Sequence, residues 1–426
     1  MNDRALFFSI IFLALFPATR GAVAADLPTA EIRLPDLVRE ALERNPEVQM
    51  AARMVEAKHA HVPQAGALPD PVLMYGVENE GRPVPFETLG TGGFSDVYVG
   101  FTQEIPFHGK RALREKVAGE EASAEEWRYE GTRRRVAAQV AEAYYDLYAT
   151  HAALGIVDES LKLLDQLTRV ARARLAVGQA SQQDVLDAEV ELSRLQERKS
   201  TLERRRATIE AALQRLLLRT APASFGRPAP VLETPLVANL DELLARAEEE
   251  SPVVREAETR TSKAERTVDL ARRERLPDFA VNVVYHNRAS LDPWYTFGGT
   301  LTLPIYAGRK QKQAILEASA DLGAARSTRE ALVSGVRFEV TESYFMASTA
   351  DHLLRLYDEG ILKQARLSLD SAIAQYEVGK VDFLTLISSW RRLLDYNLAY
   401  HEQLAEHEKA LARLAVHVSP LPGQGT

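Results

Sequence analysis

The sequence predicts a mixed α and β chain in which two similar halves each supply two membrane-type strands and a pair of long helices. The chain has 426 residues and 20 prolines, yet no proline lies between Pro106 and Pro222 or between Pro304 and Pro420. Because proline costs about 3 kcal/mol inside a helix, these tracts predict two long helical blocks. Motifs that recur at offsets of 198 to 208 residues, and period-two alternation before each tract, complete the prediction.

Residues 1–25 read as a secretory signal peptide. Arg4 precedes an apolar run from Ala5 to Phe16, and the small residues 22–25 offer a cleavage point after Ala24 or Ala25. The alternative is an uncleaved anchor, but the run is shorter than the roughly 20 residues that a bilayer-spanning helix needs. The sequence therefore predicts an exported protein.

Composition excludes several classes of protein. The chain has no cysteine, which excludes a disulfide scaffold, a lipid-modified cysteine and a cysteine nucleophile. Its formal net charge of −8 argues against a nucleic-acid binder. His59 and His61 have no third ligand nearby in the sequence, and no catalytic constellation is present. We therefore expect no enzyme activity, no cofactor and no metal site.

The duplicated motifs divide the mature chain into two structural repeats, 26–235 and 236–426. A proline-rich loop, 221–235, joins them. The paired motifs are Asn45-Pro46 with Ser251-Pro252, Leu68-Pro69-Asp70 with Leu276-Pro277-Asp278, Ile105-Pro106 with Leu303-Pro304, Tyr144-Tyr145 with Tyr344-Phe345, and Val177-Gly178 with Val378-Gly379. Each repeat is expected to open with one short helix, over 35–62 and 239–274.

The strands follow at 71–79, 95–107, 279–288 and 294–305. In the third strand, for example, Phe279, Val281 and Val283 alternate with smaller or polar residues. Strands of this length with one apolar face are typical of membrane barrels, although a soluble sheet packed on helices alternates in the same way. Four strands cannot close a barrel, and hydrocarbon cannot satisfy unpaired edges, so a membrane sheet requires several copies of the chain.

The helical blocks are expected to run out and back. The outward helices span 109–177 and 309–378, each about 100 Å long, and the returning helices span 181–219 and 382–416. Steps of three and four residues predict coiled-coil seams. The predicted seam residues are Leu154, Val157, Leu161, Leu164 and Thr168 in the first block and Leu353, Leu356, Gly360 and Lys363 in the second.

Each strand pair joins its outward helix through a proline and a glycine. These junction residues are Pro106 and Gly109 in the first repeat and Pro304 and Gly308 in the second. The proline is expected to end the strand because it lacks the N–H that a ladder needs. The simplest arrangement is a pipe with strands in a bilayer and helices extending to one side.

The sequence resembles the outer membrane efflux protein family, the TolC-like outer membrane factors. The resemblance is carried by Asn45-Pro46, Leu68-Pro69-Asp70-Pro71, Gln103-Glu104-Ile105-Pro106, Tyr144-Tyr145, Val177-Gly178 and their second-half counterparts. It implies a homotrimer whose 12-stranded β-barrel, four strands per chain, continues into a periplasmic α-helical barrel of coiled coils. It also implies a passive exit duct in the lipid of the outer membrane, a periplasmic adaptor protein, and an inner-membrane pump of the RND or ABC type.

The resemblance further implies a gate at the periplasmic tip, where Gly178 and Gly379 turn the helices back. Tyr376 and Asp184 match family positions, and we hypothesise that Tyr376, Asp184, Asp187 and Asp382 line this tip. An arginine and two aspartates of the family pattern are replaced here by Val381, Thr385 and Ser388. The alternative is that the four residues are ordinary solvated polar groups at helix ends.

Two readings of the whole chain remain open from the sequence. The first is the export duct, with heavy-metal cations or drugs as cargo. The second is a soluble periplasmic coiled-coil scaffold without a pore. Detergent dependence separates them.

Overall fold

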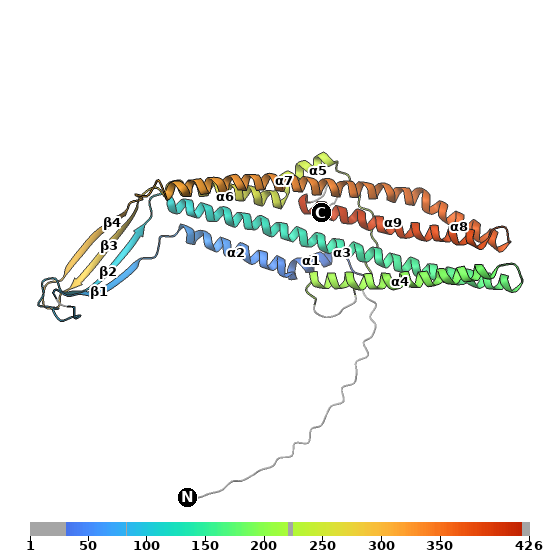
Figure 1. The fold of residues 1–426 in the computed structure, drawn as a ribbon, viewed down its shortest axis with the longest axis horizontal. Coiled ribbons are helices and arrows are strands. Elements are labelled where there is room, and N and C mark those ends of the chain that lie inside the picture. Colours follow the sequence, from blue (N-terminus) through green and yellow to red (C-terminus); the bar gives the residue numbers. More distant parts are fainter. Residues whose placement is uncertain (1–30, 82, 220–224, 420–426) are drawn as a thin grey trace, which may run out of the picture.

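A four-stranded antiparallel sheet forms one end of an elongated chain, and long helices run away from it (Figure 1). The computed structural model describes residues 31–81, 83–219 and 225–419, so the predicted signal peptide at 1–25 lies outside the described residues. The sheet order is β1-β2-β3-β4. The strands are β1 (Val72–Glu78), β2 (Asp96–Ile105), β3 (Asp278–Asn287) and β4 (Trp294–Thr302).

The register of the sheet gathers odd-numbered residues on one face. Val99 lies opposite Tyr75 and Tyr285, and Tyr285 lies opposite Tyr295. This face is exposed and apolar: its exposed members are Leu73, Tyr75, Val99, Phe101, Ile105, Phe279, Val281, Val283, Tyr285, Tyr295, Phe297 and Leu301. The even-numbered face is mixed: it carries glycine, threonine, asparagine and histidine residues together with Val72, Met74, Tyr98 and Trp294. β1 and β4 each pair on one side only within the described chain, which leaves two open edges.

All four strands end before their predicted last residue, and two of them end just before a proline. β2 stops at Ile105, next to Pro106, and β4 stops at Thr302, two residues before Pro304. Because proline has no N–H to donate, the ladder cannot continue through it. The chain therefore turns from sheet to helix at these points.

The long helices form two antiparallel pairs. α3 (Lys110–Ala176) returns as α4 (Gln182–Leu216), and α7 (Gln311–Leu356) continues through a π-helical turn, η1 (Tyr357–Ile361), into α8 (Leu362–Glu377) and returns as α9 (Phe383–His417). Within the described ranges, no helix has both the length and the apolar character needed to span a bilayer.

The first predicted seam is confirmed, but the second is wrong. Leu154, Val157, Leu164 and Thr168 are buried, whereas Leu356 is 47% exposed. The buried residues of the second seam are instead Leu354, Ala365, Leu369, Ala372 and Tyr376. Leu353 and Leu356 precede the π turn, so the prediction failed there because the seam was assigned one residue too early, at Leu353 instead of the buried Leu354. The π turn adds one residue to the helix and shifts only the residues after it, which include the predicted Lys363.

The sequence itself records this added residue. Tyr144 and Tyr344 are 200 positions apart, whereas Val177 and Val378 are 201 apart. One residue has therefore entered the second half between these motifs, and η1 lies within that interval. The π turn absorbs the insertion and keeps Tyr376 on the buried side of α8.

Each predicted short helix is two helices. These are α1 (Leu34–Arg44) and α2 (Pro46–Gly66) in the first half, and α5 (Leu240–Glu250) and α6 (Pro252–Arg273) in the second. Asn45 and Ser251 are extended, with ψ of 126° and 123°. The residue before a proline is disfavoured in the α region, and proline itself is well suited to the first helical turn, so one helix ends and another begins.

At each break, the start of one helix contacts the end of another helix of the same half. The Nδ2 atom of Asn45, at the start of α2, donates to the carbonyl oxygen of Leu216, at the end of α4, over 3.0 Å. In the second half the Oγ atom of Ser251, before α6, lies 3.2 Å from Nδ1 of His417, at the end of α9. Both joints lie beside α3 or α7, which run past them without interruption (Figure 1).

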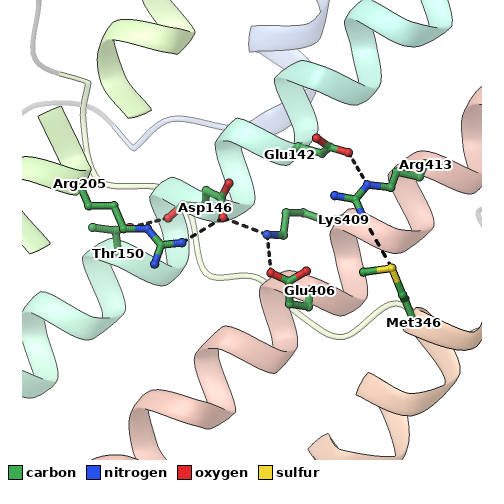
Figure 2. A network of polar contacts seen from close by, with 8 residues as sticks. All are labelled: Glu142, Asp146, Thr150, Arg205, Met346, Glu406, Lys409 and Arg413. Carbon is green, nitrogen blue, oxygen red and sulfur yellow. Dashed lines mark hydrogen bonds and ion pairs between the residues drawn. The ribbon is translucent and has the colours of Figure 1, made fainter. Parts of the chain in front are cut away.

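The two halves meet along α3 and α9 through charged side chains. Figure 2 shows Glu142 accepting from Arg413 over 2.6 Å, and Lys409 Nζ lying 3.0 Å from Asp146 and 2.6 Å from Glu406. Burial lowers the pKa of Lys409, but the two carboxylates outweigh burial and raise it. The ammonium group therefore stays charged between helices of different halves.

Candidate functional site

Two glycines close the helical hairpins at the far end from the sheet. Gly178 and Gly379 have φ of 71° and 72°, a left-handed conformation that strains other residues. The amide of Gln179 donates to the carbonyl of Arg174 over 2.8 Å, and the amide of Lys380 donates to that of Gln375 over 2.8 Å. Both tips thus end their outward helix with the same backbone motif.

Acidic side chains begin the returning helices. Ser181 and Asp184 form a reciprocal capping box at the start of α4. Asp382 caps α9 by accepting from the amide of Thr385 over 2.9 Å, and the hydrogen bonds from Thr385 lower the pKa of Asp382. Asp187 is half-buried and accepts from Gln183 over 2.9 Å. All three carboxylates therefore have local structural partners.

Tyr376 lies in the core of the tip rather than on its surface. It is 4% exposed, and its ring packs against Phe383 with centroids 5.6 Å apart. The guanidinium of Arg174 lies 4.8 Å from the ring centroid. The Tyr376 hydroxyl is buried and has no hydrogen-bond partner among the described residues. Burial, and next the negative charge of Asp184, raise the pKa of this hydroxyl.

Arg174 links the two helical pairs, and sequence reasoning missed it. From the end of α3 it donates to the carbonyl oxygens of Tyr376 and Glu377 at the end of α8, the latter over 3.2 Å. The family pattern placed a cation at position 381, which is Val381 here. In the structure Arg174 reaches the end of α8 from the other helical pair. A basic residue in the last turn of α3 was the available signal, because cations favour helix C-termini.

The structure thus brings some of the predicted gate residues together. Tyr376 and Asp184 interact electrostatically across α8 and α4, whereas Asp187 and Asp382 make contacts within their own helices. Thr385 and Ser388 bond within the first turns of α9. That these side chains line an entrance stays a prediction. Across the described ranges, no three histidine or carboxylate residues form a metal-binding group.

The two strand-to-helix junctions differ. Gly109 has φ of 87° and caps α3, and Lys110 is 1% exposed, with Nζ 2.9 Å from Asp278 and 3.1 Å from Glu274. Gly308 has open space where a Cβ atom would be. The first junction is therefore held by buried contacts, whereas the second is exposed.

The sheet has an apolar face and open edges, and coiled coils that turn back at their tips extend from it. This combination is typical of channel-forming proteins. The outer membrane efflux protein family matches residues 37–217 and 243–416, so the chain belongs to this family. Proteins of this family lie in the outer membrane, extend into the periplasm and are not enzymes.

Individual relatives are distant in sequence. The outer membrane efflux protein BepC of Brucella suis is 23% identical over 295 residues, covering 65% of this chain and 61% of BepC. The cobalt-zinc-cadmium resistance protein CzcC of Cupriavidus metallidurans is 22% identical over 365 residues, covering 84% of this chain and 82% of CzcC. The open-state structure of the Neisseria gonorrhoeae MtrE channel has a TM-score of 0.77 at 19% identity, covering 92% and 91% of the two chains.

Proposed function

We propose that this chain is the outer-membrane exit duct of a tripartite efflux pump, built from three copies. The observation that carries the proposal is the open sheet, with a continuous exposed apolar face and two unpaired edges. Hydrocarbon tolerates such a face but not such edges, so neighbouring copies must supply the missing strands. Three copies would close a 12-stranded barrel.

The duct is passive, and its partners supply the energy. The described residues form helices, a sheet and tips without a nucleotide site or a catalytic constellation. A periplasmic adaptor and an inner-membrane pump, of the RND or ABC type, are the partners that this role requires. Cross-linking of the purified protein in detergent and mass measurement test the assembly: a trimer is expected, and a detergent-free monomer would instead indicate the periplasmic scaffold.

The proposed gate is the tip, where Arg174 and Tyr376 connect the two helical pairs and Asp184, Asp187 and Asp382 lie near the starts of the returning helices. Arg174 ties α3 to α8 through two carbonyl groups and the Tyr376 ring. Separating the helical pairs would break these contacts.

Single-channel conductance in planar bilayers tests the gate. Arg174→Ala, and a combined Asp184→Ala, Asp187→Ala and Asp382→Ala variant, should raise the closed-state conductance. Asp241→Ala, which removes an exposed acidic residue from α5, is the matched control and should leave it unchanged. Unaltered conductance in both tip variants would place the gate elsewhere.

Divalent heavy-metal cations are the proposed cargo. The name of CzcC, which matches most of this chain, refers to cobalt, zinc and cadmium resistance. Three carboxylates at the tip attract cations. Growth of a channel-deficient strain that expresses this chain and its native pump tests the class: tolerance of zinc, cobalt or cadmium should rise, and tolerance of drugs alone would reassign the cargo.

A further inference from the structure

A long cavity lies at the level of the two helix joints, and both halves of the chain line it. Its volume is about 770 Å³, and its lining comes from α2, α3, α6, α7 and α9. On α3 alone the lining runs from Glu125 to Glu142, which is about 25 Å at the rise of an α-helix. A cavity of this volume suits a small molecule, and its length suits a linear one. None of the gate or junction residues described above lines it.

Acidic side chains outnumber basic ones in this lining. Within the described ranges, six glutamates and three arginines line the cavity. Each arginine already has a glutamate, and Figure 2 shows the last of these pairs: Arg135 lies 3.4 Å from Glu47, Arg128 lies 3.5 Å from Glu125, and Arg413 lies 2.6 Å from Glu142. Of the other three glutamates, Glu256 accepts from Arg260, outside the lining, over 2.9 Å. The surplus negative charge is therefore carried by Glu339 and Glu342.

This surplus lies at the end of the cavity where α7 meets α9. Glu339 lies 2.8 Å from Nε2 of His417, but burial lowers the pKa of His417 more than Glu339 raises it, so the ring is mostly neutral at neutral pH. Glu342 attracts Arg413, which already donates to Glu142. The two carboxylates of α7 therefore face the cavity without a full positive charge of their own.

The other end of the cavity holds a buried carboxylate. The side chain of Glu125 is 9% exposed, yet its ion pair with Arg128 is 3.5 Å long, and the side chain of Arg128 is 53% exposed. Because charge-assisted hydrogen bonds are usually about 2.7–2.9 Å long, the carboxylate of Glu125 is loosely paired. A buried carboxylate without a close cation is destabilising, and a cationic group in the cavity would compensate it.

The stretch between these two ends is apolar on its α2 side. α2 runs antiparallel to α3, as two ion pairs show: Glu47 with Arg135, and Lys58 with Glu121. Met50 and Met54 therefore line the cavity between its ends, where they are 59% and 40% exposed. Methionine side chains are flexible and adapt to apolar ligands of varied shape. The cavity thus has acidic ends and an apolar middle.

We propose that this cavity binds a linear aliphatic polyamine. One terminal ammonium group binds Glu125, the other binds Glu339 and Glu342, and the methylene segments lie along Met50 and Met54. A linear polycation reaches both acidic ends at once, which a compact cation cannot do. A metal ion is disfavoured, because the described residues include no group of three histidine or carboxylate side chains that could hold one. This inference does not depend on the chain being an exit duct.

Isothermal titration calorimetry of the purified protein in a non-ionic detergent tests the length of the ligand. Spermine is the long probe, and putrescine, which is too short to reach both ends, is the short one. Spermine should bind at least about tenfold more tightly, because linking the two binding groups makes the second contact intramolecular. Equal affinity for the two amines would overturn the proposal.

Glutamine variants test the two ends. Glu125→Gln, and a combined Glu339→Gln and Glu342→Gln variant, should each weaken spermine binding by about tenfold or more, since each leaves only one end to bind. Glu126→Gln is the matched control: it removes an exposed carboxylate that pairs with His59 and does not line the cavity, so it should bind spermine like the wild type. Equal losses in all three variants would show general attraction to an acidic surface and contradict the proposal.

Methionine-methyl NMR locates the ligand in the wild type. The chain has five methionines, and the resonances lost in Met50→Leu and Met54→Leu identify these two. Spermine should shift the methyl resonances of Met50 and Met54 and leave that of Met74, on β1, unchanged. Unshifted resonances of Met50 and Met54 at saturating spermine would overturn the proposal even if the glutamine variants failed to fold.

Discussion

Single residues decide how the sheet is joined to the helices. Lys110 shows this best, because its ammonium group is buried and contacts Asp278, Glu274 and the carbonyl of Leu276. It ties the start of α3 to the end of α6 and the start of β3. The corresponding region of the second half has Lys310, which is exposed.

We expect Lys110→Met to destabilise the chain by about 3 kcal/mol, since it removes the buried cation that Asp278 contacts, whereas Glu274 keeps Arg114 at 2.8 Å. Lys310→Met should change stability by less than about 0.5 kcal/mol. Denaturant unfolding followed by tryptophan fluorescence measures both. Similar losses for the two variants would show that burial of Lys110 is unimportant.

The junction glycines allow a second prediction at the same scale. Gly109→Ala should cost about 1–2 kcal/mol, because Gly109 is left-handed and a Cβ atom would lie 2.9 Å from the Arg273 side chain. Gly308→Ala meets open space and should be neutral or slightly stabilising. Melting temperatures of the two purified variants give the comparison, which fails if Gly308→Ala is the more damaging.

At the scale of the element, η1 explains how two unequal halves keep equivalent seams. The helix before it buries Leu354, and the helix after it buries Ala365 and Leu369. A regular α-helix would rotate the later residues by about 100° per added residue. The π turn takes up that rotation and preserves the packing of α8 against α9.

Deleting Gly360 should therefore convert η1 into regular α-helix and leave the fold intact, with an unchanged or higher melting temperature. Deleting Gly335 within α7 should rotate one part of that helix away from its neighbours and destabilise the protein severely. Both glycines have open space around them, so the comparison isolates the register. Circular dichroism melts report the result, and equal damage from both deletions would contradict the role of the turn.

Element types could be predicted from the sequence because they follow local rules. Alternation around Val283 and proline-free tracts identified strands and long helices within a few residues of their ends. The second seam was placed one residue too early, at Leu353 rather than Leu354, before the π turn begins. The further shift beyond the turn has no local sequence signature and shows only in the offset between Tyr344 and Val378. Arg174 was missed because its partners are carbonyl groups 202 and 203 residues away in the chain.

At the scale of the whole molecule, we expect the odd-numbered face of the sheet to meet lipid. Phe297 is 77% exposed near the middle of β4. Phe297→Lys should disfavour the membrane-inserted state by roughly 2–4 kcal/mol, the cost of a lysine at the bilayer midplane. Thr300→Lys places the same charge on the opposite face and should insert normally.

The amount of heat-modifiable oligomer recovered from outer membranes measures both lysine variants. A selective loss for Phe297→Lys is expected. Equal recovery of the two variants would show that the odd-numbered face does not meet lipid.

The joints at Asn45 and Ser251 have a mechanical consequence. The helices that meet at these joints can rotate relative to one another without stretching a covalent bond, and the continuous helices α3 and α7 hold them in line. A twist of the coiled coils near the tips would then be absorbed at these joints, and the sheet at the other end would not move.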